Sequence, residues 1–216
     1  MRLPYVPDPP NFTSEDDKAV EQRVRERRGK KGLIALDRTL LHSPPVADGW
    51  NSFLGSIRTK TSLPTSIRET AICRVAVLNR AWYEWESHSP ILSSASGTSF
   101  FNLPYAFLIV CTIHRTDFPD VTPQQVEAVL KSPPRSPQAD VLGSTLSAVL
   151  AYTDAMTLDV QVPDAVFAEL KKVSSEREIV EITATIAAYN CVSRFLVALD
   201  VGERNAQTGP KEGGKE

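Results

Sequence analysis

Apolar residues recur at three- and four-residue intervals along much of this chain, which is the spacing of amphipathic helices. The clearest case follows Ser175, which with Glu178 has the spacing of an N-terminal capping box, and the pattern stops near Gly202. The positions that share one face are Ile179, Ile182, Ile186, Tyr189, Ser193 and Leu196. We therefore predict a long helix here, with this stripe facing the core.

Prolines and helix-capping residues divide the rest of the chain into further helical pieces. A charged, solvated helix is expected to open at Ser14, and the longest patterned run opens at Ser66, which with Glu69 has the spacing of a second capping box. The predicted pieces are 14–31, 32–45, 46–57, 63–90, and helices that open at Thr122-Pro123, at Ser136-Pro137 and at Ser175.

The fold class follows from what accompanies these helices. The sequence has no convincing alternating strand pattern, no repeat of fixed period and no glycine-rich phosphate loop. Its 216 residues suffice for one domain with a substantial core. We predict an all-α, single-domain, multi-helix bundle over 35–202, preceded by an arm and charged helix over 1–34 and followed by a disordered tail over 203–216.

The segment 93–120 does not fit this pattern smoothly. It is richer in aromatic and apolar residues than a surface connection should be, and it directly follows His88-Ser89-Pro90. Three interpretations are open: a lid over a pocket, a buried extra helix from Pro104 to His114, or sequence introduced by an error in gene prediction.

Charge and composition narrow the partners. The net charge is −2, so electrostatics give no reason to expect a nucleic-acid or membrane partner. The N-terminus lacks a signal peptide's apolar core, and no run of ~18 apolar residues suggests a membrane span. We expect a cytoplasmic protein that binds a small molecule or another protein. The three cysteines, Cys73, Cys111 and Cys191, are predicted to be free buried thiols.

The stretch "AWYEWESHSP" (81–90) holds the first candidate chemistry. Glu84 and His88 are four residues apart, so on one helix their side chains can meet. A carboxylate beside an imidazole can transfer protons in a dry site, which Trp82, Tyr83 and Trp85 could provide. The same spacing also fits an ordinary surface ion pair next to core aromatics.

Glu69 is a third candidate, although the capping box already accounts for it. On one continuous helix Glu69 and Glu84 would lie ~22 Å apart, and no three-residue site could form. A break near Leu78-Asn79-Arg80 would remove this objection, because asparagine can adopt the left-handed conformation that ends a helix. Residues 81–88 would then fold back over the first turn.

The stretch "SIRETAICRVAVLNRAWYEWESHSPIL" (66–92) resembles the carboxymuconolactone decarboxylase family and the related alkylhydroperoxidase accessory (AhpD-like) proteins. The similarity covers about residues 35–90 and 120–202. It implies an all-α fold, assembly as trimers or hexamers, and a site built from a Glu, a short break and a second helix ending in His. These positions fall on Glu69 and His88.

The departures from this family pattern bear on the chemistry. In the peroxidase branch a Cys-x-x-Cys pair precedes the His, and its positions fall here on Ala81 and Glu84. Thiol–disulfide exchange then lacks both its nucleophile and its resolving partner. Cys73 does not replace them, because it has no second cysteine nearby in sequence.

What the resemblance leaves is the decarboxylase-like site, which uses neither a metal nor an organic cofactor. It implies that Glu69, Glu84 and His88 are catalytic, with His88 moving a proton at carbon and a carboxylate shuttling it. A ring or β-keto carboxylate would enter an apolar cleft. The residues expected to bind it are Trp50, Trp82 and Tyr83, with Arg80 as a carboxylate clamp and His42 as a further lining residue.

Three hypotheses for function follow. The first is a cofactor-independent decarboxylase or related carbon-acid enzyme acting on a ring lactone or polyketide-like acid. The second is a thiol-dependent antioxidant protein, which needs a reactive cysteine pair. The third is a non-catalytic oligomeric scaffold or small-molecule binder with the same fold. Convergence of Glu69, Glu84 and His88 beside a cavity would favour the first over the third.

Overall fold

The computed structural model describes residues 1–95 and 121–210, and every regular element in these two stretches is helical. Most of the segment 93–120, together with its three interpretations and Cys111, lies outside the described residues. The elements are α1 (Glu15–Arg28), the 3₁₀ turn η1 (Gly29–Lys31), α2 (Ala35–Leu40), α3 (Pro44–Thr59), α4 (Thr65–Leu78), α5 (Trp82–Ser93), α7 (Pro123–Lys131), α8 (Ala139–Leu158), α9 (Asp164–Val173) and α10 (Glu176–Leu199). The prediction of an all-α bundle is confirmed.

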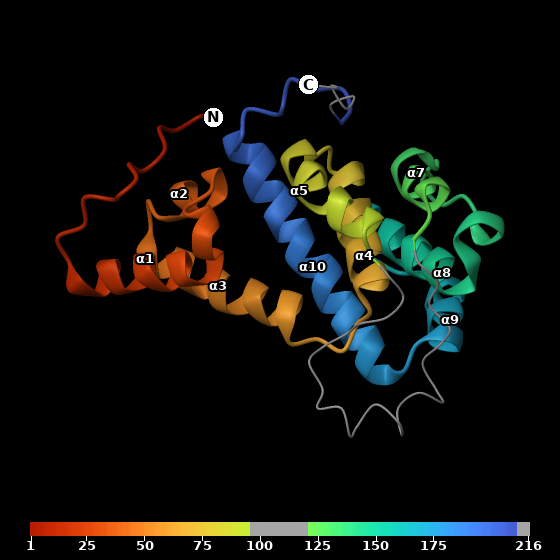
Figure 1. Cartoon of the computed structure of the whole chain (residues 1–216). Helices are drawn as coiled ribbons and strands as arrows, with labels where there is room; N and C mark the ends of the chain where they lie inside the picture. The colour runs from red at the N-terminus through yellow and green to blue at the C-terminus, as the bar shows by residue number, and fades with distance from the viewer. Residues whose placement is uncertain (96–120, 211–216) are drawn as a thin grey trace.

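Helix α4 is the centre of the bundle. It packs against α5, α8 and α10, and Figure 1 shows it between α10 and the helices α7 to α9. Ten of its 14 residues are buried, so the helix lacks a solvated face. A helix surrounded in this way has little amphipathic periodicity, and its position in the core could not be read from its pattern.

Helix α10 matches its prediction closely. The Ser175 hydroxyl accepts from the backbone N–H of Glu178, and the Glu178 carboxylate accepts from the backbone N–H of Ser175, which completes the capping box. All six residues of the predicted stripe are buried. The helix ends at Leu199, where Asp200 adopts the left-handed conformation with φ 53°. This helix therefore supplies the longest core-facing surface of the bundle.

Several predicted helix boundaries need correction. The start at Thr122-Pro123 is confirmed by a capping box between Thr122 and Gln125. The start at Ser136-Pro137 is wrong, because α8 begins at Ala139 and is kinked at Gly143, which has φ 72°. The two prolines at 44–45 lie inside the first turn of α3, where a missing N–H costs nothing. Helix α9 was not predicted.

Residues 203–210, in the predicted tail, contact α5. The indole N–H of Trp82 donates to the Gln207 carbonyl at 3.0 Å, and Arg204 forms an ion pair with Glu86 at 2.8 Å. The polar composition suggested disorder, but α5 supplies partners for these groups. This segment therefore packs against the start of α5.

Two helices are long and apolar enough to cross a membrane by length and composition alone. They are α8 and α10, with mean hydropathies of 1.2 and 1.4 over 18 residues. The buried share of these windows is 56% and 44%, and both helices pack on α4. Core helices of a bundle give the same hydropathy, so the measure does not indicate a membrane here.

A buried ion pair links α4 to α7 and α8. The Arg74 guanidinium donates to both carboxylate oxygens of Asp154, at 2.6 and 3.0 Å, and to the carbonyls of Val129 and Ser132. The backbone N–H of Arg135 also donates to Asp154. Arg74 and Asp154 are each at most 1% exposed. Such a pair is stable only because these bonds satisfy the guanidinium and carboxylate on several sides.

We predict that Asp154→Asn lowers the free energy of unfolding by about 3–5 kcal/mol, because it leaves the Arg74 charge buried without a counter-charge. Urea denaturation measures the change. The control is Asp159→Asn, which removes an ion pair to Arg135 whose partners are 59% and 42% exposed, and which we expect to cost less than about 1 kcal/mol. Equal losses in the two variants would contradict this prediction.

Candidate functional site

The chain breaks between α4 and α5, where the sequence predicted a break. Helix α4 ends at Leu78, Asn79 has φ −88°, and Arg80 has φ 54°. The residue in the left-handed region is therefore Arg80 and not Asn79, whose side chain instead donates to Asn190 at 3.2 Å. The backbone N–H of Ala81 bonds to the Ala76 carbonyl at 2.8 Å and closes the turn. Helix α5 then packs against α4 (Figure 1).

This turn brings Glu69 and His88 into contact. His88 Nδ1 lies 2.7 Å from Glu69 Oε2, and the two side chains are 13% and 3% exposed. The predicted capping box at Ser66 is wrong, because Pro64 occupies the N-cap and Ser66 lies within the helix with its Oγ unbonded. Glu69 is therefore free of a capping role. Its second oxygen, Oε1, accepts from Arg68 Nε at 3.2 Å.

Two residues that the sequence did not single out extend this contact. The Tyr189 hydroxyl of α10 lies 3.3 Å from His88 Nε2, and the two rings meet edge to face. Arg58, in the last turn of α3, donates from Nε to the same hydroxyl at 2.8 Å. We call Arg58, Tyr189, His88 and Glu69 the relay. The sequence places Tyr189 in the core stripe of α10, and no local pattern around Arg58 indicates a functional role.

One arrangement of protons satisfies all of these hydrogen bonds. Because the Tyr189 oxygen accepts from Arg58, its own proton is available to His88 Nε2. His88 Nε2 is then an acceptor, so the ring proton is on Nδ1 and is donated to the Glu69 carboxylate. All three bonds run in the same direction, from the guanidinium to the carboxylate.

The phenol of this relay stays protonated near neutral pH. Burial raises the pKa of Tyr189 to about 12, and the carboxylates of Glu69 and Glu84 add to the rise. The charge and hydrogen bond of Arg58 oppose it. Tyr189 therefore has a proton to donate to His88 Nε2 in this arrangement.

Glu84 does not join the relay. Its side chain is fully buried, and Ser193 Oγ lies 3.1 and 3.0 Å from its two carboxyl oxygens. Burial raises the pKa of Glu84 well above its ordinary value, and neither the Ser193 bond nor the charge of Arg58 offsets this. Glu84 therefore keeps its proton to higher pH than an exposed glutamate. The predicted pairing of Glu84 with His88 is not what the structure shows.

The predicted substrate residues on α2, α3 and the break do not gather at the relay. His42 is exposed, and its Nε2 lies 2.7 Å from the Pro4 carbonyl of the N-terminal arm. Trp50 packs against Phe195 at a ring-centroid distance of 5.2 Å, with its buried indole N–H unbonded. Arg80 is exposed, and its contribution is the backbone turn.

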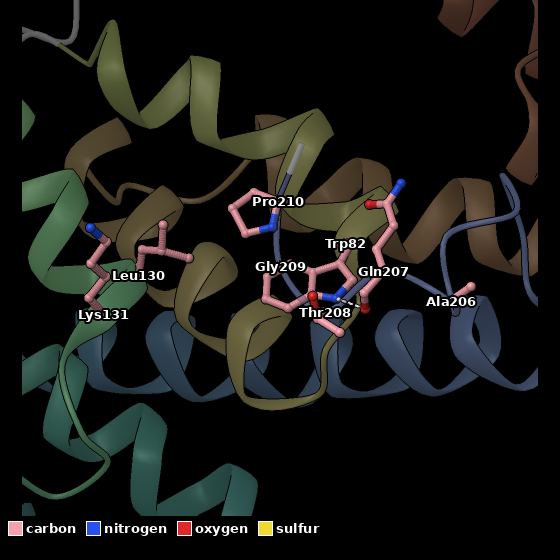
Figure 2. A pocket seen from close by; sticks show the side chains of 8 residues that line it. All are labelled: Trp82, Leu130, Lys131, Ala206, Gln207, Thr208, Gly209 and Pro210. Carbon is pink, nitrogen blue, oxygen red and sulfur yellow. Dashed lines mark hydrogen bonds between the residues drawn. The ribbon is translucent and has the colours of Figure 1, made fainter. Parts of the chain in front are cut away.

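The two predicted aromatic residues of α5 also lie apart from each other. Trp82 lines a groove of about 840 Å³ between the end of α7 and residues 206–210, as Figure 2 shows. The Tyr83 ring instead covers Gly202, where a Cβ would lie 2.2 Å from the ring, so only glycine fits. Of the three aromatic residues predicted to line one apolar cleft, Trp50, Trp82 and Tyr83, only Trp82 lines this groove.

Metal ligands and cysteine thiols are the remaining candidate functional groups in the described residues. In residues 1–95 and 121–210 no cluster of three or more His, Cys, Asp or Glu side chains could hold a metal ion. Cys73 is buried as predicted, and desolvation raises the pKa of its thiol well above the ordinary value, with Glu69 and Glu84 adding to the rise. Cys191 is exposed, which corrects its predicted burial.

Comparison with known proteins places the fold. The chain superposes on an uncharacterized peroxidase-related protein from Silicibacter sp. TM1040 with a TM-score of 0.62 and 14% identity, over 94% of this chain and 95% of that one. It also superposes on a protein of unknown function from Agrobacterium tumefaciens, named as a candidate antioxidant defence protein AhpD. That match has a TM-score of 0.53 and 19% identity, over 79% of this chain and 94% of that one.

No protein-family model matches the chain, and no curated protein matches it. At identities of 14% and 19% the structural likeness shows the fold alone. The predicted AhpD-like, all-α fold is confirmed on this basis.

We predict that Glu84→Gln stabilises the protein increasingly as the pH rises. Unfolding exposes Glu84, which then ionises at its ordinary pKa, whereas the folded protein keeps the proton to higher pH. Between these two pKa values the folded state binds more protons, so the free energy of unfolding of the wild type falls as pH increases. Glutamine does not ionise, so the variant does not lose free energy of unfolding in this way as the pH rises. Urea denaturation from about pH 5 to about pH 8 measures it.

The control for Glu84→Gln is Glu169→Gln, because Glu169 is 62% exposed in a surface pair with Lys172. We expect no such pH trend in this control. If the gain in free energy of unfolding of Glu84→Gln over the wild type shrank with rising pH, the upward pKa shift of Glu84 would be contradicted.

We also predict that Arg80→Gly raises the free energy of unfolding by about 0.5–1 kcal/mol, because glycine adopts positive φ without the steric cost that arginine bears. Asn79→Gly is the comparison and should destabilise, since φ at Asn79 is −88°, glycine adds disorder to the unfolded chain, and the variant loses the side-chain bond to Asn190. Urea midpoints measure both. Destabilisation by Arg80→Gly would show that its side chain, and not its backbone, matters to the turn.

Proposed function

We propose that this protein is a cofactor-independent enzyme that transfers a proton to or from carbon, of the carboxymuconolactone decarboxylase type. Its substrate would be a ring lactone or a polyketide-like carboxylic acid. The observation that carries the proposal is the 2.7 Å contact between His88 Nδ1 and Glu69, in a site that is nearly closed to solvent. A buried carboxylate bonded to one ring nitrogen is the arrangement that orients a histidine for general acid–base work.

The relay suits a decarboxylation step. When the bond between the carboxylate carbon and the adjacent carbon breaks, carbon dioxide leaves and the electron pair stays on the adjacent carbon as an enolate. A protonated His88 would deliver the proton from Nε2 to that carbon and return to its neutral form. Glu69 balances the imidazolium charge before the transfer, because its carboxylate lies against Nδ1.

Thiol-dependent peroxide reduction has less support, although the similar Silicibacter protein is named as peroxidase-related. Ala81 and Glu84 stand where that chemistry needs sulfur. Burial holds the Cys73 thiol protonated, and a thiol attacks peroxide only as the thiolate. Cys191 is exposed on α10, with no second cysteine beside it in sequence.

A non-catalytic small-molecule binder is the second candidate. Two observations favour it. Glu84 does not converge with Glu69 and His88, and the groove at Trp82 contains no residue of the relay, so an apolar ligand could bind there without meeting His88. Removing the Trp82 ring would weaken such binding and leave proton transfer unchanged.

The proposal includes an assembly and a cellular location. A cytoplasmic homo-oligomer, trimer or hexamer, is consistent with the exposed apolar side chains of α3, Val46 and Phe53, each 52% accessible in the single chain. No nucleic-acid or membrane partner is proposed.

We predict that His88→Ala abolishes proton transfer while the fold survives. The measurement is the rate of carbon dioxide release, or of deuterium exchange from D₂O into the adjacent carbon, over a panel of lactone and β-keto acids. Loss of the acid–base group should lower the rate by about 10²–10⁴-fold, and Glu69→Gln should lower it in the same direction. The matched control is His42→Ala, since His42 is exposed and bonded to Pro4. An active wild type with unchanged rates in His88→Ala would refute the proposal.

A further inference from the structure

We propose that Arg58 is the group that binds the substrate carboxylate, at the tyrosine end of the relay. This inference rests on the proposed function, because it names the part of the substrate that faces Arg58. It replaces the sequence-based assignment of that role to Arg80, whose side chain is exposed.

The guanidinium of Arg58 has unused hydrogen-bonding capacity. Among the described residues only its Nε has a hydrogen-bond partner, the Tyr189 hydroxyl, and the central carbon lies 5.6 Å from the Tyr189 ring centroid. Within residues 1–95 and 121–210, Arg58 has no carboxylate within ion-pair distance. Four other partly or fully buried arginines each have such a partner: Arg27 and Arg28 on Asp37, Arg68 on Glu69, and Arg74 on Asp154.

The carboxylate of Asp37 is already shared by two arginines, Arg27 and Arg28. Burial lowers the pKa of Arg27, and the positive charges of Arg28 and Arg58 lower it further, so Arg27 lies within electrostatic reach of both. A substrate carboxylate would supply the directly bonded counter-charge that Arg58 lacks among the described residues.

Hydrogen bonds also connect Arg58 to His88, the proposed acid–base residue. Arg58 Nε and His88 Nε2 share the Tyr189 hydroxyl, at 2.8 and 3.3 Å. A carboxylate bound to the Nη groups would therefore lie one tyrosine hydroxyl away from His88 Nε2. The fork of a guanidinium fixes a carboxylate in two directions, which an ammonium group does not.

The test is binding of benzoate compared with benzamide, its neutral analogue, followed by NMR shifts of the His88 ring. We expect the wild type to prefer benzoate, and Arg58→Gln to bind it about tenfold more weakly or worse, with benzamide unaffected. Arg58→Lys should recover part of the preference because it keeps the charge. Arg80→Gln is the matched control and should bind as the wild type does.

Circular dichroism and thermal unfolding confirm that each variant is folded. Two results would overturn the inference: no preference for benzoate in the wild type, or benzoate binding in Arg58→Gln within about twofold of the wild type. Failure of the proposed function looks different. In that case His88→Ala would keep full turnover, while benzoate binding would still depend on Arg58.

Discussion

The turn at Arg80 is the constraint on which the candidate site depends. A left-handed conformation costs a non-glycine residue about 1–2 kcal/mol. The packing of α5 on α4 and the bond from Ala81 to Ala76 offset that cost. On a continuous helix Glu69 and His88 would lie ~28 Å apart, whereas across this turn they are in hydrogen-bond contact. A local backbone conformation thus creates a long-range contact between two ionisable side chains.

Helix α10 completes the site from the other side. Its buried stripe supplies Tyr189 to His88 and, one turn later, Ser193 to Glu84. The two carboxyl groups of the site therefore have different environments. Glu69 lies between the imidazole of His88 and the guanidinium of Arg68. Glu84 has only the Ser193 hydroxyl as a partner, and burial raises the pKa of its carboxyl group well above the ordinary value. Carboxyl groups with perturbed pKa values are common at functional sites.

The sequence predicted the parts of this arrangement that are local. The helix starts at Ser14, Thr122 and Ser175 follow from capping residues next to each helix, and the break near Asn79 followed from one residue type. The same local reasoning misled at Ser66, because Pro64 is the N-cap of α4 and Ser66 lies inside the helix. The left-handed residue of the break is Arg80 and not Asn79, whose side chain donates to Asn190.

The rest of the site could not be read from neighbouring residues. Arg58 and Tyr189 are 131 positions apart, and Tyr189 and His88 are 101 apart, so only the packing of α3, α5 and α10 brings them together. The position of a tyrosine in a core stripe does not show which groups its hydroxyl contacts. The groove at Trp82 was missed because its walls include residues 206–210, whose composition suggested disorder.

The most direct test of the central claim is ¹⁵N NMR of the His88 ring at neutral pH. If the relay orients His88 as proposed, Nδ1 carries the proton and Nε2 does not, and Glu69→Gln weakens that preference. A ring protonated on Nε2 in the folded wild type, or one whose tautomer is unchanged in Glu69→Gln, would contradict the account.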